Sequence, residues 1–257
     1  MGACNLPLTP IGYGAFKIGR NQATKYASAY DLPDDATVDR LLNTVLELGV
    51  RYIDTAPAYG SSEERIGRAI GHRRSEFHLS TKVGETFENG RSTYDFSAAF
   101  VRTGVERSLR RLRTEVIDLV LVHASRNDLD VITRTDVVPT LQALRDEGAV
   151  RCIGLSGYTT GAFENALTWA DAIMVEYHAE YRALEPVIAA ASANGLAVIV
   201  KKPLASGRLD ASPALSLVLS NPGVTSAVVG GLNLDHLRDN VAVANAVRPG
   251  VPMRQGG

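Results

Sequence analysis

The sequence predicts an α/β protein, a (β/α)8 TIM barrel that occupies residues 1–257 as a single domain. Short runs of β-branched or aliphatic residues alternate with longer amphipathic stretches, and this alternation is typical of βαβ units. Eight strand–helix repeats in 257 residues match the usual size of a closed parallel barrel, whereas a doubly wound sheet typically uses fewer strands. No Pro-rich, Ser-rich or low-complexity linker divides the chain.

The expected strands are short apolar runs, and each one after the first follows a segment with helical periodicity. They span residues 11–13, 51–54, 78–82, 117–122, 152–156, 172–176, 197–201 and 226–229. The helices have typical ends: Asp34 precedes the first helix and Gly49 ends it, while Gly148 and Gly195 close two others. Residues 20–33 form the only long stretch without clear periodicity, and we expect a loop over the barrel mouth there.

Charge and cysteine content argue against several classes of partner and site. The net charge is −1 at pH 7 and no block of like charge occurs, so we expect neither a nucleic acid nor a membrane as partner. Cys4 and Cys152 are far apart and in no metal-ligand spacing, which predicts neither a disulfide framework nor a zinc site. Residues 1–6 carry no targeting signal, and we expect a cytoplasmic protein. The sequence does not predict the oligomeric state.

Four polar residues follow apolar strands, in the positions where a barrel of this kind builds its active site. Asp54 ends the second expected strand, Tyr59 follows five positions later, Lys82 ends the third strand and His123 follows the fourth. Because barrel active sites lie at the carboxyl ends of the strands, we expect these four side chains to meet.

Together these four residues suit the reduction of a carbonyl group. The carbonyl oxygen gains negative charge when a hydride reaches the carbon, so it needs a proton, and Tyr59 is the expected donor. A tyrosine normally titrates near pH 10, and a cation beside its oxygen lowers the pKa. Lys82 would supply that cation, Asp54 would hold Lys82, and His123 would orient the carbonyl oxygen by donating a ring N–H.

The sequence resembles the aldo-keto reductase superfamily, whose motif of Asp, a five-residue step to Tyr, then Lys and His at successive strand ends matches these four residues. The resemblance extends over nearly the whole chain, through Gly12-Tyr13-Gly14, Arg151-Cys152-Ile153-Gly154-Leu155-Ser156, Val228-Val229-Gly230-Gly231 and Asp239-Asn240. It implies a barrel enzyme that reduces an aldehyde or ketone, or runs the reverse reaction, with NADPH or NADH. No G-x-G-x-x-G fingerprint follows any strand, which agrees with this family.

The resemblance also implies which residues hold the dinucleotide. Ser156 matches the residue that binds the nicotinamide carboxamide, and Asn240 matches the one that contacts the adenine. The segment of residues 201–208 looks like the family's pyrophosphate loop, with Lys201, Pro203, Leu204, Ser206 and Arg208 as candidates.

This sequence departs from the family pattern at several cofactor positions. Gly157 stands where many members carry Asn, and Met174 stands where a Gln usually helps to hold the carboxamide, so the nicotinamide contacts are expected to be made differently. The run that begins at Gly230 lacks the usual cation for a 2′-phosphate, and His236 and Arg238 are the nearest downstream substitutes. We expect NADPH as cofactor, with NADH as an alternative.

The substrate is expected to contact aromatic residues in loops, namely Phe16, Tyr26 and Phe87. The chain ends at Gly257, shortly after the last expected helix, whereas many members of the family continue into a C-terminal loop that closes over the substrate. An open pocket is therefore expected.

Three other functions are compatible with a barrel. A dinucleotide-binding sensor or accessory subunit would share the fold but show little turnover. A metal-dependent hydrolase would need several His and carboxylate ligands at strand ends, and only His123 of the five histidines is well placed, so no metal is expected. An isomerase or lyase would use Lys82 or Lys201 as a Schiff-base nucleophile.

Overall fold

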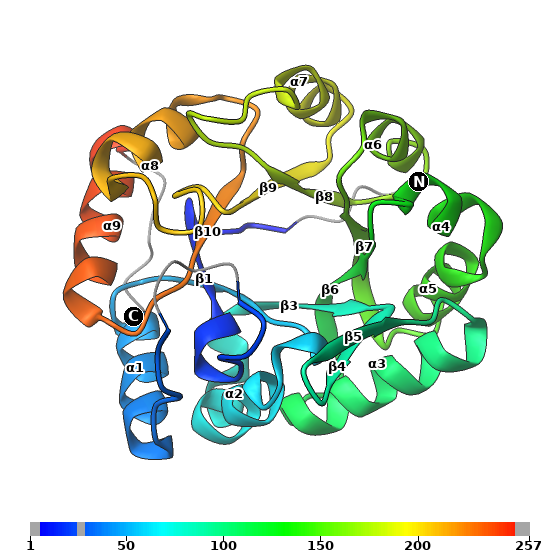
Figure 1. The fold of residues 1–257 in the computed structure, drawn as a ribbon, viewed down its shortest axis with the longest axis horizontal. Coiled ribbons are helices and arrows are strands. Elements are labelled where there is room, and N and C mark those ends of the chain that lie inside the picture. Colours follow the sequence, from blue (N-terminus) through cyan, green and yellow to red (C-terminus); the bar gives the residue numbers. More distant parts are fainter. Residues whose placement is uncertain (1–5, 25–28, 250–257) are drawn as a thin grey trace.

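The computed structural model describes residues 6–24 and 29–249, and in this part of the chain eight parallel strands close into a barrel (Figure 1). The strands follow one another around the barrel in the order β1-β10-β9-β8-β7-β6-β3-β2. They are β1 (Ile11–Gly14), β2 (Tyr52–Asp54), β3 (His78–Val83), β6 (Ile117–His123), β7 (Val150–Ser156), β8 (Ala172–Glu176), β9 (Ala197–Lys201) and β10 (Ser226–Val229). The predicted barrel is confirmed.

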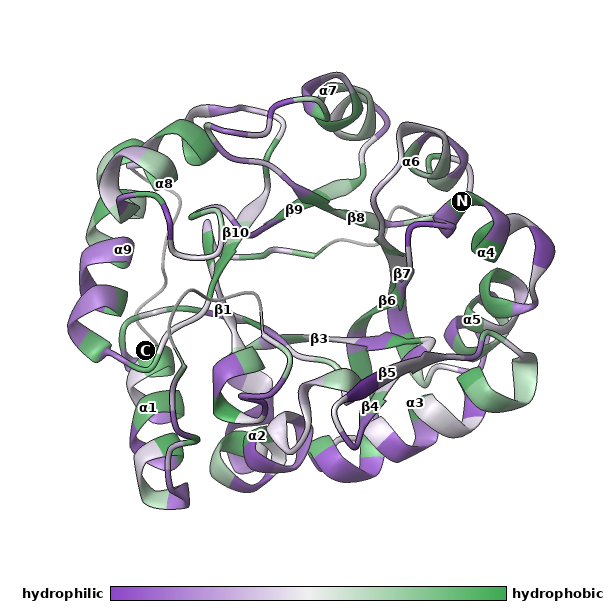
Figure 2. Ribbon diagram, in the orientation of Figure 1, coloured by the Kyte–Doolittle hydropathy of each residue, from purple (hydrophilic) through white to green (hydrophobic). Residues whose placement is uncertain are grey.

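The helices surround the barrel (Figure 1). They are α1 (Asp35–Glu47), α2 (Ser62–Ile70), α3 (Ala98–Leu112), α4 (Asp128–Arg134), α5 (Val137–Asp146), α6 (Thr160–Ala166), α7 (Glu185–Ala193), α8 (Ala211–Ser220) and α9 (Leu234–Val247), with short 3-10 segments η1 (Ala15–Ile18), η2 (Pro57–Tyr59) and η3 (Gly71–Glu76). Asp34 caps α1 by accepting a hydrogen bond from the backbone N–H of Thr37. Most helices combine hydrophobic and hydrophilic residues (Figure 2), as amphipathic helices on a barrel must.

Alternation along the strands divides the core into two layers. Val120 and Val122 of β6 pack against the helices, in the larger hydrophobic cluster. Leu119 and Leu121 belong to a second cluster that also contains Met174 and fills the inside of the barrel. The barrel is therefore packed through its centre, and side chains can reach a ligand only at its ends.

A hairpin after β3 was not predicted. It consists of β4 (Glu85–Glu88) and β5 (Arg91–Tyr94), which pair antiparallel. Asn89 and Gly90 both have positive φ, +51° and +78°, as the two central residues of a tight hairpin turn require. Phe87, expected in a loop, therefore lies on a strand of this hairpin.

The remaining expectations concern the loop of residues 20–33, the cysteines and membrane-spanning helices. Described residues between 20 and 33 form neither helix nor strand, as predicted, whereas Tyr26 and Cys4 lie outside the described residues, as do residues 250–257. Cys152 is buried in the barrel interior and is disulfide-bonded, which the sequence did not predict. No helix in the described ranges is both long and apolar enough to cross a membrane.

Candidate active site

The carboxyl ends of β2, β3, β6 and β7 bring the predicted catalytic residues to one mouth of the barrel. Asp54 is the last residue of β2, His123 is the last of β6, and Lys82 lies one residue before the end of β3. In the barrel register His123 is opposite Ser156, so the expected nicotinamide-binding serine stands beside the expected catalytic histidine. Parallel pairing thus gathers residues that are up to 102 positions apart in the sequence.

Asp54 and Lys82 form a buried ion pair with every ammonium proton engaged. Lys82 Nζ donates to Asp54 Oδ1 at 2.7 Å, to Asp54 Oδ2 at 2.8 Å and to the backbone oxygen of Thr55 at 2.8 Å. Ser80 Oγ donates a further hydrogen bond of 2.8 Å to Asp54 Oδ1. Burial lowers the pKa of Lys82. The negative charge of Asp54 acts in the opposite direction, because it favours the ammonium form, but burial has the larger effect on the pKa.

Tyr59 ends the 3-10 segment η2, and its ring lies beside Lys82 and His123. Lys82 Nζ is 4.8 Å from the centre of the Tyr59 ring, and the ring of His123 stands nearly perpendicular to it at a centre-to-centre distance of 6.2 Å. Phe16 contacts the ring from another side at 5.0 Å. Gly60 fixes this turn: it has φ +61°, and a Cβ there would lie 2.2 Å from the backbone oxygen of Gly19.

His123 has a carboxylate neighbour that the sequence analysis missed. Its Nδ1 is buried and lies 2.9 Å from Oε2 of Glu85, the first residue of the hairpin, although the N–H is not aligned as in a hydrogen bond. Burial lowers the pKa of His123, and Glu85 opposes this change. Burial by itself would raise the pKa of Glu85, but His123, Ser92 and Arg20 outweigh it and bring the value to about 2. The carboxylate is thus ionised at neutral pH.

The expected nicotinamide site contains a lysine contact in place of the usual amides. Lys201 Nζ donates to Ser156 Oγ at 3.1 Å and to the backbone oxygen of Gly157 at 3.0 Å, and it lies 4.4 Å from the centre of the Tyr158 ring. Met174, although next to Ser156 in the register, packs inside the barrel. Lys201 therefore contacts both Ser156 and the ring of Tyr158.

The loop after β9 has an unusual backbone. Lys202, Ala205, Ser206 and Gly207 all have positive φ, and Pro203 is buried among them. The cations of this region already have acidic partners: Arg208 Nη2 lies 2.7 Å from Oε2 of Glu180, and Lys202 pairs with Glu176. Leu204 packs partly against the core, and Ser206 is half-buried.

The loop after β10 and helix α9 carry the remaining cofactor candidates. Asn233 caps the helix by accepting hydrogen bonds from the backbone N–H groups of residues 235 and 236. His236 is exposed, and the exposed Arg238 pairs with Asp235 at 2.7 Å. Asn240 is buried, and its Oδ1 has no hydrogen-bond partner among the described residues. Gly230 is so close to Gly14 that a Cβ would meet the Gly14 oxygen at 2.7 Å.

The mouth of the barrel is lined by two of the predicted substrate residues and by an arginine that was not predicted. The Arg20 guanidinium lies 3.3 Å from the centre of the Phe87 ring and 5.4 Å from that of Phe16. Arg20 Nη1 also donates to the backbone oxygen of Ala58 at 3.0 Å, which ties the loop before α1 to the turn that carries Tyr59.

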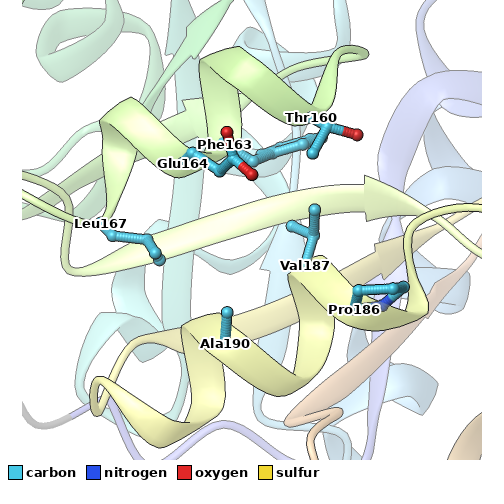
Figure 3. Close-up of a pocket in the computed structure, with 7 residues that line it drawn as sticks. All are labelled: Thr160, Phe163, Glu164, Leu167, Pro186, Val187 and Ala190. Atoms are coloured by element: carbon cyan, nitrogen blue, oxygen red, sulfur yellow. The ribbon is translucent and has the colours of Figure 1, made fainter.

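A groove on the outside of the barrel is separate from this mouth. The groove lies between α6 and α7 (Figure 3). It is lined by Thr160, Phe163, Glu164, Leu167, Pro186, Val187 and Ala190. In residues 6–24 and 29–249 there is no group of three or more His, Cys, Asp or Glu side chains that could hold a metal ion.

Comparisons with known proteins agree on one family. The sequence model described as "Aldo/keto reductase family" matches residues 10–213. An L-galactose dehydrogenase of Arabidopsis thaliana is 27% identical over 94% of this chain and 86% of its own length.

Solved structures agree with the sequence matches. A putative aldo-keto reductase from Pseudomonas aeruginosa is 44% identical with a TM-score of 0.87, over 93% of this chain and 91% of that chain. An aldo/keto reductase from Klebsiella pneumoniae, solved in complex with NADP and acetate, is 25% identical with a TM-score of 0.74, over 95% of this chain and 88% of that chain.

Proposed function

Because this chain belongs to the aldo/keto reductase family, and is an oxidoreductase acting on carbonyl or alcohol groups, we propose that Tyr59 is the general acid and base of its reaction. The observation that carries the proposal is the meeting of Tyr59, Lys82 and His123 at one mouth, with Lys82 Nζ 4.8 Å from the tyrosine ring. A sensor or accessory subunit that binds a dinucleotide without turnover has no need of this arrangement.

When bound, a reduced nicotinamide would supply the hydride for the carbonyl carbon. Tyr59 gives its phenolic proton to the carbonyl oxygen, which yields the alcohol, and the proton is replaced from solvent. Lys82 stabilises the phenolate that remains, because its positive charge lies against the tyrosine. Asp54 keeps Lys82 charged and in place through its two hydrogen bonds. The reverse sequence oxidises an alcohol with Tyr59 as base.

The residues of this chain fit a dinucleotide. Ser156 Oγ and Lys201 Nζ are the polar atoms that would bind the carboxamide, and the positive-φ backbone of the loop after β9 would contact the pyrophosphate. Asn240 Oδ1, buried and without a partner among the described residues, suits the exocyclic amine of adenine. We expect NADPH to be preferred, since Arg238 and His236 can both contact a 2′-phosphate at the start of α9.

The first test is turnover of the purified protein with NADPH and with NADH, against a panel of aldehydes, ketones and aldoses. Loss of nicotinamide absorbance identifies the activity and the preferred cofactor. The dehydrogenase of Arabidopsis thaliana oxidises a sugar according to its name, so the panel includes sugars with NADP and NAD in the oxidising direction.

Tyr59→Phe then tests the role of the phenol. Because general acid catalysis contributes about 100- to 10,000-fold, kcat should fall by that factor, while the dissociation constant of NADPH, measured by fluorescence titration, stays nearly unchanged. Tyr181→Phe is the matched control, since Tyr181 is exposed in the loop after β8. Retained turnover in Tyr59→Phe would refute the mechanism, and cofactor binding by the wild-type protein with no turnover on any substrate would favour the sensor.

A further inference from the structure

The hairpin after β3 carries a carboxylate back over the active site. Glu85 follows Lys82 by three positions, and its side chain is 11% exposed. Ser92, on the opposite strand of the hairpin, donates to Glu85 Oε1 at 2.5 Å. Gly84 sets the direction of the hairpin, because it has φ +103° and packs so closely that a Cβ would lie 2.0 Å from Phe96. The position of Glu85 is therefore determined by the backbone around it.

The other Glu85 oxygen, Oε2, faces Nδ1 of His123. That nitrogen is buried, so water cannot satisfy it, and the carboxylate oxygen 2.9 Å away is available as its acceptor. An ionised carboxylate can only accept hydrogen bonds. A small turn of the imidazole ring aligns an Nδ1–H with Glu85, whereas a bare Nδ1 would place a lone pair against the negative charge.

We infer that Glu85 is a positioning residue that keeps the ring proton of His123 on Nδ1 and leaves Nε2 to face the substrate. This inference rests on the proposed function and gives His123 two distinct roles. Neutral His123 then has a lone pair on Nε2 and accepts a hydrogen bond from an alcohol hydroxyl. With one proton held on Nδ1, only the imidazolium form can donate from Nε2 to a carbonyl oxygen. The direction of the reaction and the charge of His123 are therefore linked.

Several charged or titratable groups act on His123 from the surrounding elements. They are Glu85 of β4, Lys82 of β3, Lys201 of β9 and Tyr59 of η2. Glu85 itself is affected by Arg20, Tyr94 and Tyr158. Burial, Lys82 and Lys201 lower the pKa of His123 below its usual 6.5, and Glu85 raises it. Carbonyl reduction should thus decline as pH rises through the His123 pKa, and alcohol oxidation should decline as pH falls through it.

NMR of protein labelled with 15N in its histidine rings tests the tautomer directly, without any need for turnover. The His123 signals are assigned by their absence in His123→Asn. Above the His123 pKa, the wild-type protein should show the proton on Nδ1, and Glu85→Gln should shift the population toward Nε2–H, because the Gln amide can donate to Nδ1. A wild-type ring with its proton on Nε2, or the same tautomer in both proteins, would overturn the inference.

Kinetics supply the second readout. In Glu85→Gln the neutral ring can donate from Nε2, so reduction should lose its decline toward high pH, which in the wild type approaches about tenfold per pH unit above the pKa. Oxidation by the variant should fall in kcat, because its Nε2 lone pair is lost. Glu88→Gln, an exposed change on the same strand, is the control and should keep both wild-type pH profiles.

Parallel pH profiles for Glu85→Gln and the wild type would contradict the role assigned to Glu85. If Tyr59→Phe were active, the proposed function would fail while the NMR result still decided the role of Glu85.

Discussion

Replacing Lys82 by Met removes one half of a buried ion pair and leaves the other half in place. Asp54 is 4% exposed and receives two hydrogen bonds from Lys82, so its remaining side-chain partner in the variant is Ser80, at 2.8 Å. Met has nearly the shape of the Lys stem, which keeps the packing loss small. Breaking a buried pair in this way costs about 3–5 kcal/mol of unfolding free energy, because an uncompensated charge remains buried.

The cost should appear as a lower Tm. A domain of this size loses roughly 2–4 °C for each kcal/mol, so Lys82→Met should melt roughly 6–20 °C below the wild type in calorimetry at pH 7. The double variant Asp54→Asn, Lys82→Met should recover most of this loss, since neither charge remains. Arg134→Met is the control: its ion pair with Asp130 at 3.2 Å is 78% and 62% exposed on the two sides and should matter little. A loss for Lys82→Met as small as that of the control would refute the reasoning.

Two further predictions concern the hairpin and the acid stability of the barrel. Gly84→Ala combines a positive φ with a Cβ 2.0 Å from Phe96, so this variant should have both a lower Tm and reduced turnover. Gly90→Ala has φ +78° but no atom within 4 Å of its Cβ, so it should lose only about 1 kcal/mol of unfolding free energy. Equal losses of stability in the two variants would show that the contact with Phe96 is unimportant. Burial by itself would raise the pKa of Asp118, but His78 and Arg74 outweigh it and bring the value to about 2, so this group adds stability above its unfolded pKa near 3.8 that is lost as pH falls toward 2. Asp118→Asn should therefore have a flatter stability profile between about pH 4 and about pH 2 in urea titrations, and an unchanged slope would contradict this.

The barrel was predictable because its strands are buried on both faces and read as apolar runs. The bounds of β8, β9 and β10 are those expected from the sequence, and the other five barrel strands differ by one or two residues at an end. The hairpin was missed because β5 is fully exposed and no apolar alternation marks it. Asn89-Gly90, a strong hairpin turn signal, could have revealed it.

The site was predictable only where its residues follow strands. Tyr59, Lys82 and Asp54 meet because parallel register determines which strand ends are neighbours. Glu85 and His123 are 38 positions apart, and nothing in their spacing indicates that a hairpin folds one over the other. The pairing of Lys201 with Ser156 likewise depends on the closure of the barrel.

The ion pairs of the loop after β9 affect the binding of an anion at that loop. Arg208 and Glu180 are both half exposed or more, and an exposed pair of this kind contributes little free energy. If the pyrophosphate of the proposed dinucleotide binds this loop, it exchanges places with a carboxylate that already pairs with Arg208. The gain in free energy is then the difference between two acceptors, so a count of cations overstates the electrostatic attraction. In that case affinity for the dinucleotide depends mainly on the shape of the loop and on the groups that hold the two ends of the dinucleotide.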